Sequence, residues 1–203
     1  MVALRRTGYQ PRISLDRESK WLNGELPDNW GEALIGCEAF LHVAAYSVAS
    51  GSNDWERCFQ ANVLDSIRLW QQAVVAGIKH FLIVGSCFEY GRSGIRYDAI
   101  PVTAPLEPTT AYGASEAAAS IAALALAVEH QLRLVVARPF HVYGKVEAPG
   151  RFWPSLVAAA KAGEDLPMTR GEQIRDFQPV EQTANQLFLY YLTLYFIQEI
   201  PLF

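Results

Sequence analysis

The sequence predicts an α/β protein with a three-layer architecture built around a sheet of strand–helix units. Short apolar runs of strand length alternate with longer segments in which apolar residues recur every three or four positions. Of the 203 residues, 51% are hydrophobic, which is enough for one sizeable core. Units of this kind are joined by right-handed crossovers.

Composition and charge exclude several classes of protein. The net charge is −4, and Arg5-Arg6 is the longest basic cluster, so nucleic acid is not an expected partner. Three cysteines lack metal-ligand spacing and are typical of reduced thiols in a cytoplasmic protein: Cys37, Cys58 and Cys87. We therefore expect no metal site. The N-terminus has no apolar segment typical of a secretory signal.

The first half of the chain supplies two strands and one long helix. Residues 2–6 look like the end of a strand, and residues 39–43 form a second one. Residues 7–33 show no clear period and carry turn signals from 21 to 30. Apolar residues at steps of three and four predict a helix over 54–76, capped by Ser52, Asn53 or Asp54 and ended by Gly77.

The second half continues the alternation. We expect strands at 79–84 and 132–137, helices at 112–130 and 151–163, and a non-helical loop over 91–110, which contains three prolines. Residues 187–197 are apolar on every side but too short to span a bilayer. They form either a buried helix or a foreign tail.

Two hydroxyl groups are placed so that they can meet over one substrate. Ser86 leaves a buried strand at its carboxyl end, where ligands bind in open α/β sheets. Tyr112 opens the alanine-rich helix after the proline-spaced loop.

These residues resemble motifs of the extended short-chain dehydrogenase/reductase family of nucleotide-sugar epimerases, dehydratases and reductases. The family has Ser or Thr four residues before Tyr-Gly, as Ser86 stands before Tyr90-Gly91. Its Tyr-x-x-x-Lys motif is matched at Tyr112, but Glu116 replaces the lysine. The resemblance implies an incomplete Rossmann-like NAD(P)-binding domain over 1–180, lacking the first strand–Gly-turn–helix unit. Residues 181–203 would be an apolar tail in place of a full substrate lobe.

The resemblance also implies cofactor-binding residues for NAD or NADP. Arg5 would favour a 2′-phosphate, although Arg5 and Arg6 are equally well explained as surface arginines. The other positions that match are Ala44, Ala45, Asn62, Pro139 and His141. Asn62 is explained as well by a hydrogen bond to a neighbouring carbonyl. Loss of the glycine turn removes backbone N–H groups that would hold the pyrophosphate, which weakens the expected binding.

Substrate and partner follow from the same resemblance. Arg175 matches an arginine that clamps the diphosphate of a nucleotide sugar, a role that suits a guanidinium. A surface Arg–Asp pair explains it otherwise. The helices 54–76 and 112–130 would form a homodimer seam, and we expect no membrane partner.

The family's reaction needs a tyrosine base with a lowered pKa, and the lysine one turn on supplies the positive charge and holds the cofactor ribose. Glu116 reverses that charge, so we expect a raised pKa for Tyr112 and reduced activity. As a carboxylate it would also be unable to donate hydrogen bonds to the ribose.

Several functions remain. Cys87 and Phe88 stand where dehydratases of the family place their acid–base pair, which disfavours dehydration. A 4-epimerase or 4-keto reductase is the first hypothesis. The second is a non-catalytic relative that dimerises or binds a partner, and the third is a membrane-associated protein using residues 187–197.

Overall fold

The computed structural model describes residues 1–9, 19–46 and 54–196, except the side chains of the last three residues. Its strands are β1 Val2–Arg5, β2 Lys20–Asn23, β3 Ala39–His42, β4 His80–Val84, β5 Arg133–Ala137, β6 His141–Tyr143 and β7 Phe177–Pro179. Its longer helical segments are α1 Gly31–Leu34, α2 Trp55–Phe59, a π-helical turn Gln60–Asp65, α3 Ser66–Val75, α4 Ala111–His130, α5 Phe152–Ala162 and α6 Val180–Phe196.

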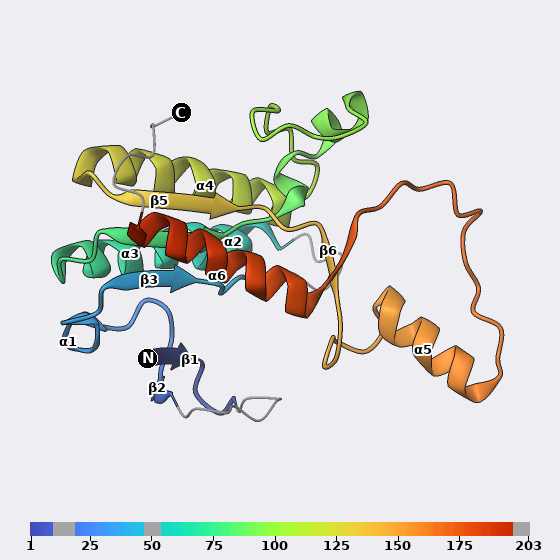
Figure 1. The fold of residues 1–203 in the computed structure, drawn as a ribbon, viewed down its shortest axis with the longest axis horizontal. Coiled ribbons are helices and arrows are strands. Elements are labelled where there is room, and N and C mark those ends of the chain that lie inside the picture. The colour runs from blue at the N-terminus through green and yellow to red at the C-terminus, as the bar shows by residue number, and fades with distance from the viewer. Residues whose placement is uncertain (10–18, 47–53, 197–203) are drawn as a thin grey trace.

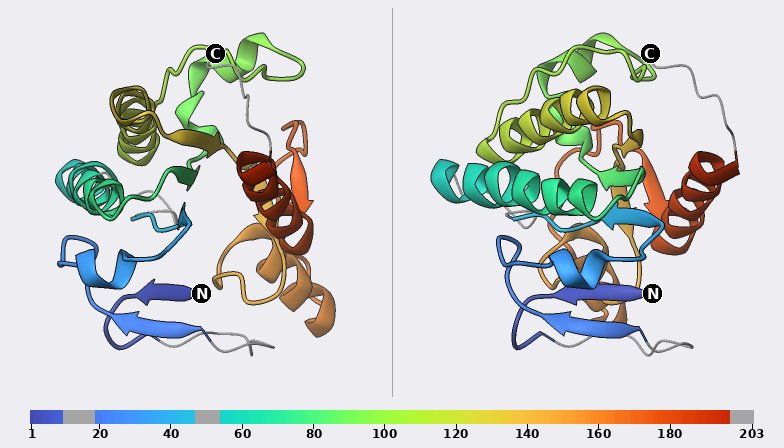
Figure 2. Two further views of the ribbon diagram at one scale, coloured as in Figure 1. Left: turned by 60° about the vertical axis from the view of Figure 1, so that its left-hand side comes forward. Right: turned by 90° about the vertical axis from the view of Figure 1, so that its left-hand side faces the viewer.

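Every strand pair is parallel, which confirms the α/β prediction. β3, β4 and β5 form a three-stranded sheet with β4 in the middle, whereas β1 and β2 form a separate pair. Figure 1 shows β1, β3 and β5 running in the same direction, and Figure 2 shows the β1–β2 pair beside β3. Within the described part of the chain, β1 and β3 therefore each have one edge without a paired strand.

Helices cover both faces of the three-stranded sheet. α3 and α4 lie on one face and α6 lies on the other, against β4 and β5 (Figure 2). The core between the sheet and the first group of helices includes Trp70, Phe81 and Ile83, each at most 4% exposed. α5 buries none of its residues and lies apart from the sheet (Figure 1).

The predicted helix over 54–76 is present as one run of helical backbone with a π-helical turn inside it. The Asp54 side chain accepts a hydrogen bond from the Arg57 N–H at 3.1 Å, so Asp54 is the cap. Ser52 and Asn53 lie outside the described residues. Gly77 follows with φ +87°, a conformation that glycine adopts without strain.

Three expectations need correction. β2 lies in the segment 7–33, which showed no period, because its four residues are ordered by pairing with β1. The loop 91–110 contains a short 3₁₀ turn, Arg92–Arg96, ahead of its prolines. The apolar stretch from 187 is helical but not buried on every side: Phe188 and Leu189 are each 59% exposed. Residue 197, its predicted end, lies outside the described range.

The predicted domain boundary at residue 180 coincides with the start of α6. This helix packs against β4 and β5, which belong to the predicted domain over 1–180. α4 has the length and hydropathy of a membrane-spanning helix, and half of its most apolar window is buried inside the protein. Core helices of globular proteins share this property, so it carries no assignment to a membrane.

Hydrogen exchange should rank the strands by their pairing. Backbone amides of β4 should exchange most slowly because both of its edges are paired, while the β1–β2 and β6–β7 pairs should exchange faster since a two-stranded sheet is marginal. Peptide-resolved mass spectrometry measures this. If β1 were as protected as β4, its second edge would be paired in solution.

Candidate active site

A buried carboxylate fixes the turn that follows β4. Glu89 is fully buried and accepts a hydrogen bond from the Ser86 N–H at 2.9 Å. The Ser86 hydroxyl oxygen in turn accepts the Phe88 N–H at 3.2 Å, which completes a capping box. The second Glu89 oxygen pairs with Arg138 Nε at 2.6 Å, just after β5. Ser86 is thus held in place from two strands.

Tyr112 is brought to Ser86 by the start of α4. The Thr110 hydroxyl oxygen caps the helix by accepting the Gly113 N–H at 3.0 Å. A Cβ atom at position 113 would lie 2.6 Å from the Phe88 carbonyl oxygen, so glycine allows the helix to approach the turn closely. The Phe88 ring of the turn packs edge-on against the Tyr112 ring, with centroids 5.9 Å apart, and the nearby Ser86 side chain acts to lower the pKa of Tyr112. The start of α4 therefore lies against the turn that carries Ser86, and the joint action of the two hydroxyls on one substrate stays a prediction.

Glu116 lies one turn after Tyr112 and is only 6% exposed. Burial, together with the nearby Glu89 carboxylate, raises its pKa to about 8. The pKa of Tyr112 is also raised well above its ordinary value, first by burial and then by Glu116, against the opposing hydrogen bond from Ser86. The direction agrees with the prediction, but burial is the larger cause.

Asn62 joins three elements by its side-chain amide. Its Nδ2 donates to Ser115 Oγ of α4 at 2.9 Å and to the Tyr46 carbonyl at 3.2 Å, and its Oδ1 accepts the Tyr46 N–H at 2.7 Å. These bonds fix the segment after β3 that includes Ala44 and Ala45. Asn62 therefore shapes this edge of the site from within the protein.

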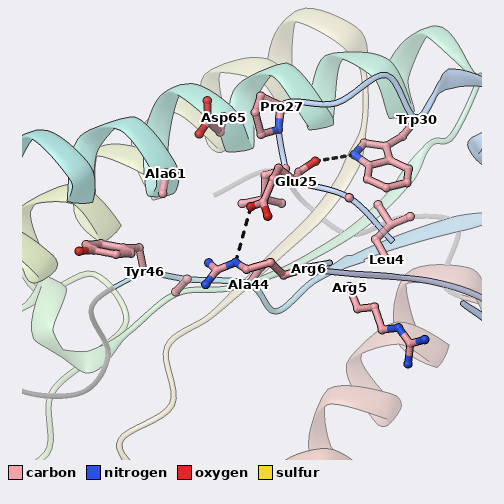
Figure 3. Close-up of a pocket in the computed structure, with 13 residues that line it drawn as sticks. Leu4, Arg5, Arg6, Glu25, Pro27, Trp30, Ala44, Tyr46, Ala61 and Asp65 are labelled. Carbon is pink, nitrogen blue, oxygen red and sulfur yellow. Dashed lines mark hydrogen bonds and ion pairs between the residues drawn. The ribbon is translucent and has the colours of Figure 1, made fainter. Parts of the chain in front are cut away.

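A cleft lies at the carboxyl ends of β1 and β3, lined by Arg6, Glu25, Ala44, Ala45 and Tyr46 among others (Figure 3). Arg6 forms an ion pair with Glu25 at 3.5 Å, whereas Figure 3 shows Arg5 pointing away from these groups. Arg5 donates to Asn23 Oδ1 at 2.7 Å and lies over the Trp21 ring. Arg6, more than the predicted Arg5, faces the cleft.

A second, smaller cavity borders the cleft, because Ala44 lines both. Its wall includes Gly85, Glu116, Ser120 and the buried His42. Burial lowers the pKa of His42 to about 4, and its Nε2 lies 3.4 Å from Ser66 Oγ, so His42 is a neutral packed side chain. The two spaces adjoin at the ends of the strands, the region of an open α/β sheet where ligands bind.

Arg175 and His141 meet through a small parallel sheet of β6 and β7. The His141 N–H donates to the Asp176 carbonyl at 3.1 Å, and Arg175 Nη1 lies 3.3 Å from His141 Nε2. The positive charge of Arg175 also acts on the Cys87 thiol, whose pKa burial raises. Pro139 accepts the Cys87 N–H at 3.2 Å. Arg175, His141 and Pro139 therefore lie near Cys87, the residue that follows Ser86 in the turn after β4.

The roles of Glu89, Arg138 and Tyr46 were missed from the sequence. Ser86-x-x-Glu89 is a capping-box spacing, so this part was detectable. The pairing with Arg138 spans two strands, and Tyr46 has no motif around it. No cluster of three or more potential metal-binding side chains occurs among the residues that the structure describes.

Removing Arg138 should destabilise the protein strongly, because the fully buried Glu89 carboxylate would lose its cation. We expect Arg138→Ala to lower the free energy of unfolding by about 3–5 kcal/mol in urea denaturation. Arg96→Ala is the matched control, since its partner Glu107 is 39% exposed, and it should change stability by less than about 1 kcal/mol. Equal losses would contradict the assignment.

Comparison with known proteins supports the fold and identifies the family. The NAD dependent epimerase/dehydratase family matches residues 1–193. A dTDP-glucose 4,6-dehydratase of Streptomyces griseus is 27% identical over 78% of this chain and 46% of its own length. A UDP-glucose 4-epimerase of Corynebacterium glutamicum is 24% identical over 82% of this chain and 55% of its own length.

A solved structure gives the same picture. MoeE5 in complex with UDP-glucose and NAD superposes with a TM-score of 0.73 and 28% identity, over 89% of this chain and 61% of that one. The chain thus spans about half the length of the curated relatives it matches. Since the family match covers nearly all of the residues, the chain belongs to the NAD dependent epimerase/dehydratase family.

Proposed function

We propose that this chain is part of an NAD(P)-dependent nucleotide-sugar 4-epimerase or 4-keto reductase whose hydride transfer is impaired by Glu116. The observation that carries the proposal is the placement of Tyr112, at the start of α4, against the turn that carries Ser86, with the buried Glu116 carboxyl group one turn further on. The pair supplies a hydroxyl and a phenol for one reacting oxygen. The third position lacks the cation that would ionise the phenol.

The cofactor is NAD or NADP. The cleft with Arg6, Ala44 and Ala45 would hold its adenosine half, and the adjoining cavity at Glu116 would face the nicotinamide half. We also retain Arg5, Asn62, Pro139 and His141 as cofactor-site residues, with Asn62 acting through the segment at Tyr46. A bound nicotinamide would accept and return the hydride of the sugar.

The chain's own groups would handle the proton. Tyr112 would take the proton of the sugar hydroxyl, and Ser86 would hold the same oxygen by a hydrogen bond. The raised pKa of Tyr112 makes phenolate scarce at neutral pH, so this step is slow. The protein would therefore bind its cofactor and substrate but catalyse the reaction slowly.

An epimerase or reductase fits better than a dehydratase, although the relatives include both classes. Water elimination needs an acid and a base beside the tyrosine, and Cys87 and Phe88 stand at those positions. Glu89 is the nearest carboxylate, but it is fully buried and engaged with Ser86 and Arg138. It is therefore not free to act on a substrate.

The proposed substrate is a nucleotide-diphosphate sugar bound through Arg175. Its guanidinium lies beside His141 and near Cys87, on the Ser86 side of the site. A planar cation suits a diphosphate because it offers several fixed donors. The absence of a disulfide at Cys37, Cys58 and Cys87 favours the cytoplasm as the location.

A second candidate is a non-catalytic relative that acts through dimerisation. α4 exposes a row of apolar side chains at Ile121, Leu124 and Val128, and Leu64 is exposed on the neighbouring π-helical turn. Helices with such a row commonly pack against a partner. The predicted homodimer through 54–76 and 112–130 would use this face in either case.

Restoring the cation should restore catalysis. We expect Glu116→Lys to raise hydride transfer from UDP-glucose or dTDP-glucose to NAD by about 100-fold or more, because the lysine would lower the pKa of Tyr112. Single-turnover nicotinamide absorbance measures it. Glu129→Lys, the same change at a side chain 72% exposed on α4, should give no gain. Adding Tyr112→Phe to Glu116→Lys should abolish the gain, and its persistence would refute Tyr112 as the base.

Charge on the exposed row of α4 should break a dimer. We expect Leu124→Glu to convert the protein to a monomer in analytical ultracentrifugation, since a carboxylate would be buried in the seam. Ile95→Glu, at a side chain 86% exposed in the 3₁₀ turn, is the control and should leave the assembly unchanged. A monomeric unmodified chain would rule out the seam.

A further inference from the structure

The indole N–H of Trp70 is a buried hydrogen-bond donor that no protein group accepts. Trp70 lies on α3 and is 1% exposed, and its Nε1 has no hydrogen-bond partner among the residues that the structure describes. The His42 ring meets the Trp70 ring edge-on, with centroids 5.6 Å apart, but His42 Nε2 lies 3.4 Å from Ser66 Oγ instead. Buried tryptophan N–H groups normally bond to protein or to ordered water, so this donor requires an acceptor.

Glu116 on α4 is a second buried polar group without a protein partner. It is 6% exposed and forms no hydrogen bond or ion pair within the described part of the chain. The cation Arg138 is already paired with the neighbouring Glu89, at 2.6 Å. The carboxyl group of Glu116 therefore has unused acceptor oxygens in the interior.

Trp70 and Glu116 line the same small cavity, between α3, α4 and the strands β3 and β4. Its volume of about 10 Å³ has room for one water molecule and for nothing larger. Ile83 and Ala119 give it apolar wall, and Ser120, at 2% exposed, adds a hydroxyl group. Cavities lined only by hydrocarbon stay dry, whereas a cavity with several polar groups binds water.

We propose that this cavity binds one ordered water molecule, which accepts a hydrogen bond from the Trp70 indole N–H and donates one to the Glu116 carboxyl group. The water joins α3 to α4 inside the core and gives both buried groups a partner. This inference does not depend on the proposed function, because it concerns only groups in the interior of the protein.

A water molecule suits Glu116 with or without its proton. Burial and the Glu89 carboxylate raise the pKa of Glu116 to about 8. A protonated carboxyl group keeps an oxygen that accepts a hydrogen bond, and a carboxylate has two. The same bridge can therefore form in both states.

The first experiment measures magnetisation transfer from water to the assigned indole protons by solution NMR. We expect a cross-peak of the sign typical of a long-lived water at the Trp70 indole proton. Trp30 is the matched control, because it is 8% exposed and its Nε1 already donates to the Glu25 carbonyl at 3.1 Å. It should give no such cross-peak. A missing cross-peak at Trp70, or equal ones at both residues, would overturn the proposal.

Three variants separate the bound water from other sources of this signal. Hydroxyl and carboxyl protons exchange with water and can relay the same magnetisation, so Ser120→Ala and Glu116→Gln each remove one such proton. The glutamine still offers an acceptor oxygen, and the Trp70 cross-peak should remain in both variants. Its loss in either variant would contradict a bound water. Glu116→Leu removes the acceptor and should abolish the cross-peak, and its persistence would contradict the bridge to Glu116.

A crystal structure of the unmodified chain is the second experiment, and it gives the position of the water directly. We expect a water oxygen about 2.7–3.2 Å from both Trp70 Nε1 and a carboxyl oxygen of Glu116. An empty cavity, or a direct hydrogen bond between Trp70 Nε1 and Glu116, would overturn the proposal.

Discussion

The buried ion pair of Glu89 and Arg138 is the interaction on which the site depends. It ties the ends of β4 and β5 together, and the same carboxylate holds the Ser86 backbone. A Cβ at position 85 would collide with Glu89, so glycine is required at the end of β4. The position of Ser86 and the charge beside Glu116 both follow from this one carboxylate.

Most of the fold was predictable because its strands and helices each have a hydrophobic pattern within one continuous stretch of sequence. The apolar runs at β3, β4 and β5 and the periodic helices at 54–76 and 112–130 were identified with boundaries within two residues or so. β2 was not, since its four residues carry no pattern of their own and depend on hydrogen bonds to β1. The π-helical turn was likewise invisible, because it leaves the apolar period nearly intact.

The candidate site was predictable only where a motif is local. Ser86, Tyr112 and Glu116 stand in short motifs, and the structure brings them together. The raised pKa of Glu116 was not foreseen, because it comes from burial and from the Glu89 carboxylate, which reaches this place only through the folding of the turn after β4. The likeness of Arg5 and Arg6 in the sequence also hid the difference in where their side chains point (Figure 3).

The division of the sheet has a mechanical consequence. The cleft has one wall from the β1–β2 pair, with Arg6, and the other from the segment after β3, with Ala44, and no ladder of hydrogen bonds joins the two sheets among the described residues. Side-chain packing around Trp30, Leu4 and Leu26 sets their separation, and such packing is more compliant than a ladder. A ligand that contacts both walls of the cleft would hold the two sheets at a fixed separation and would stabilise the folded protein.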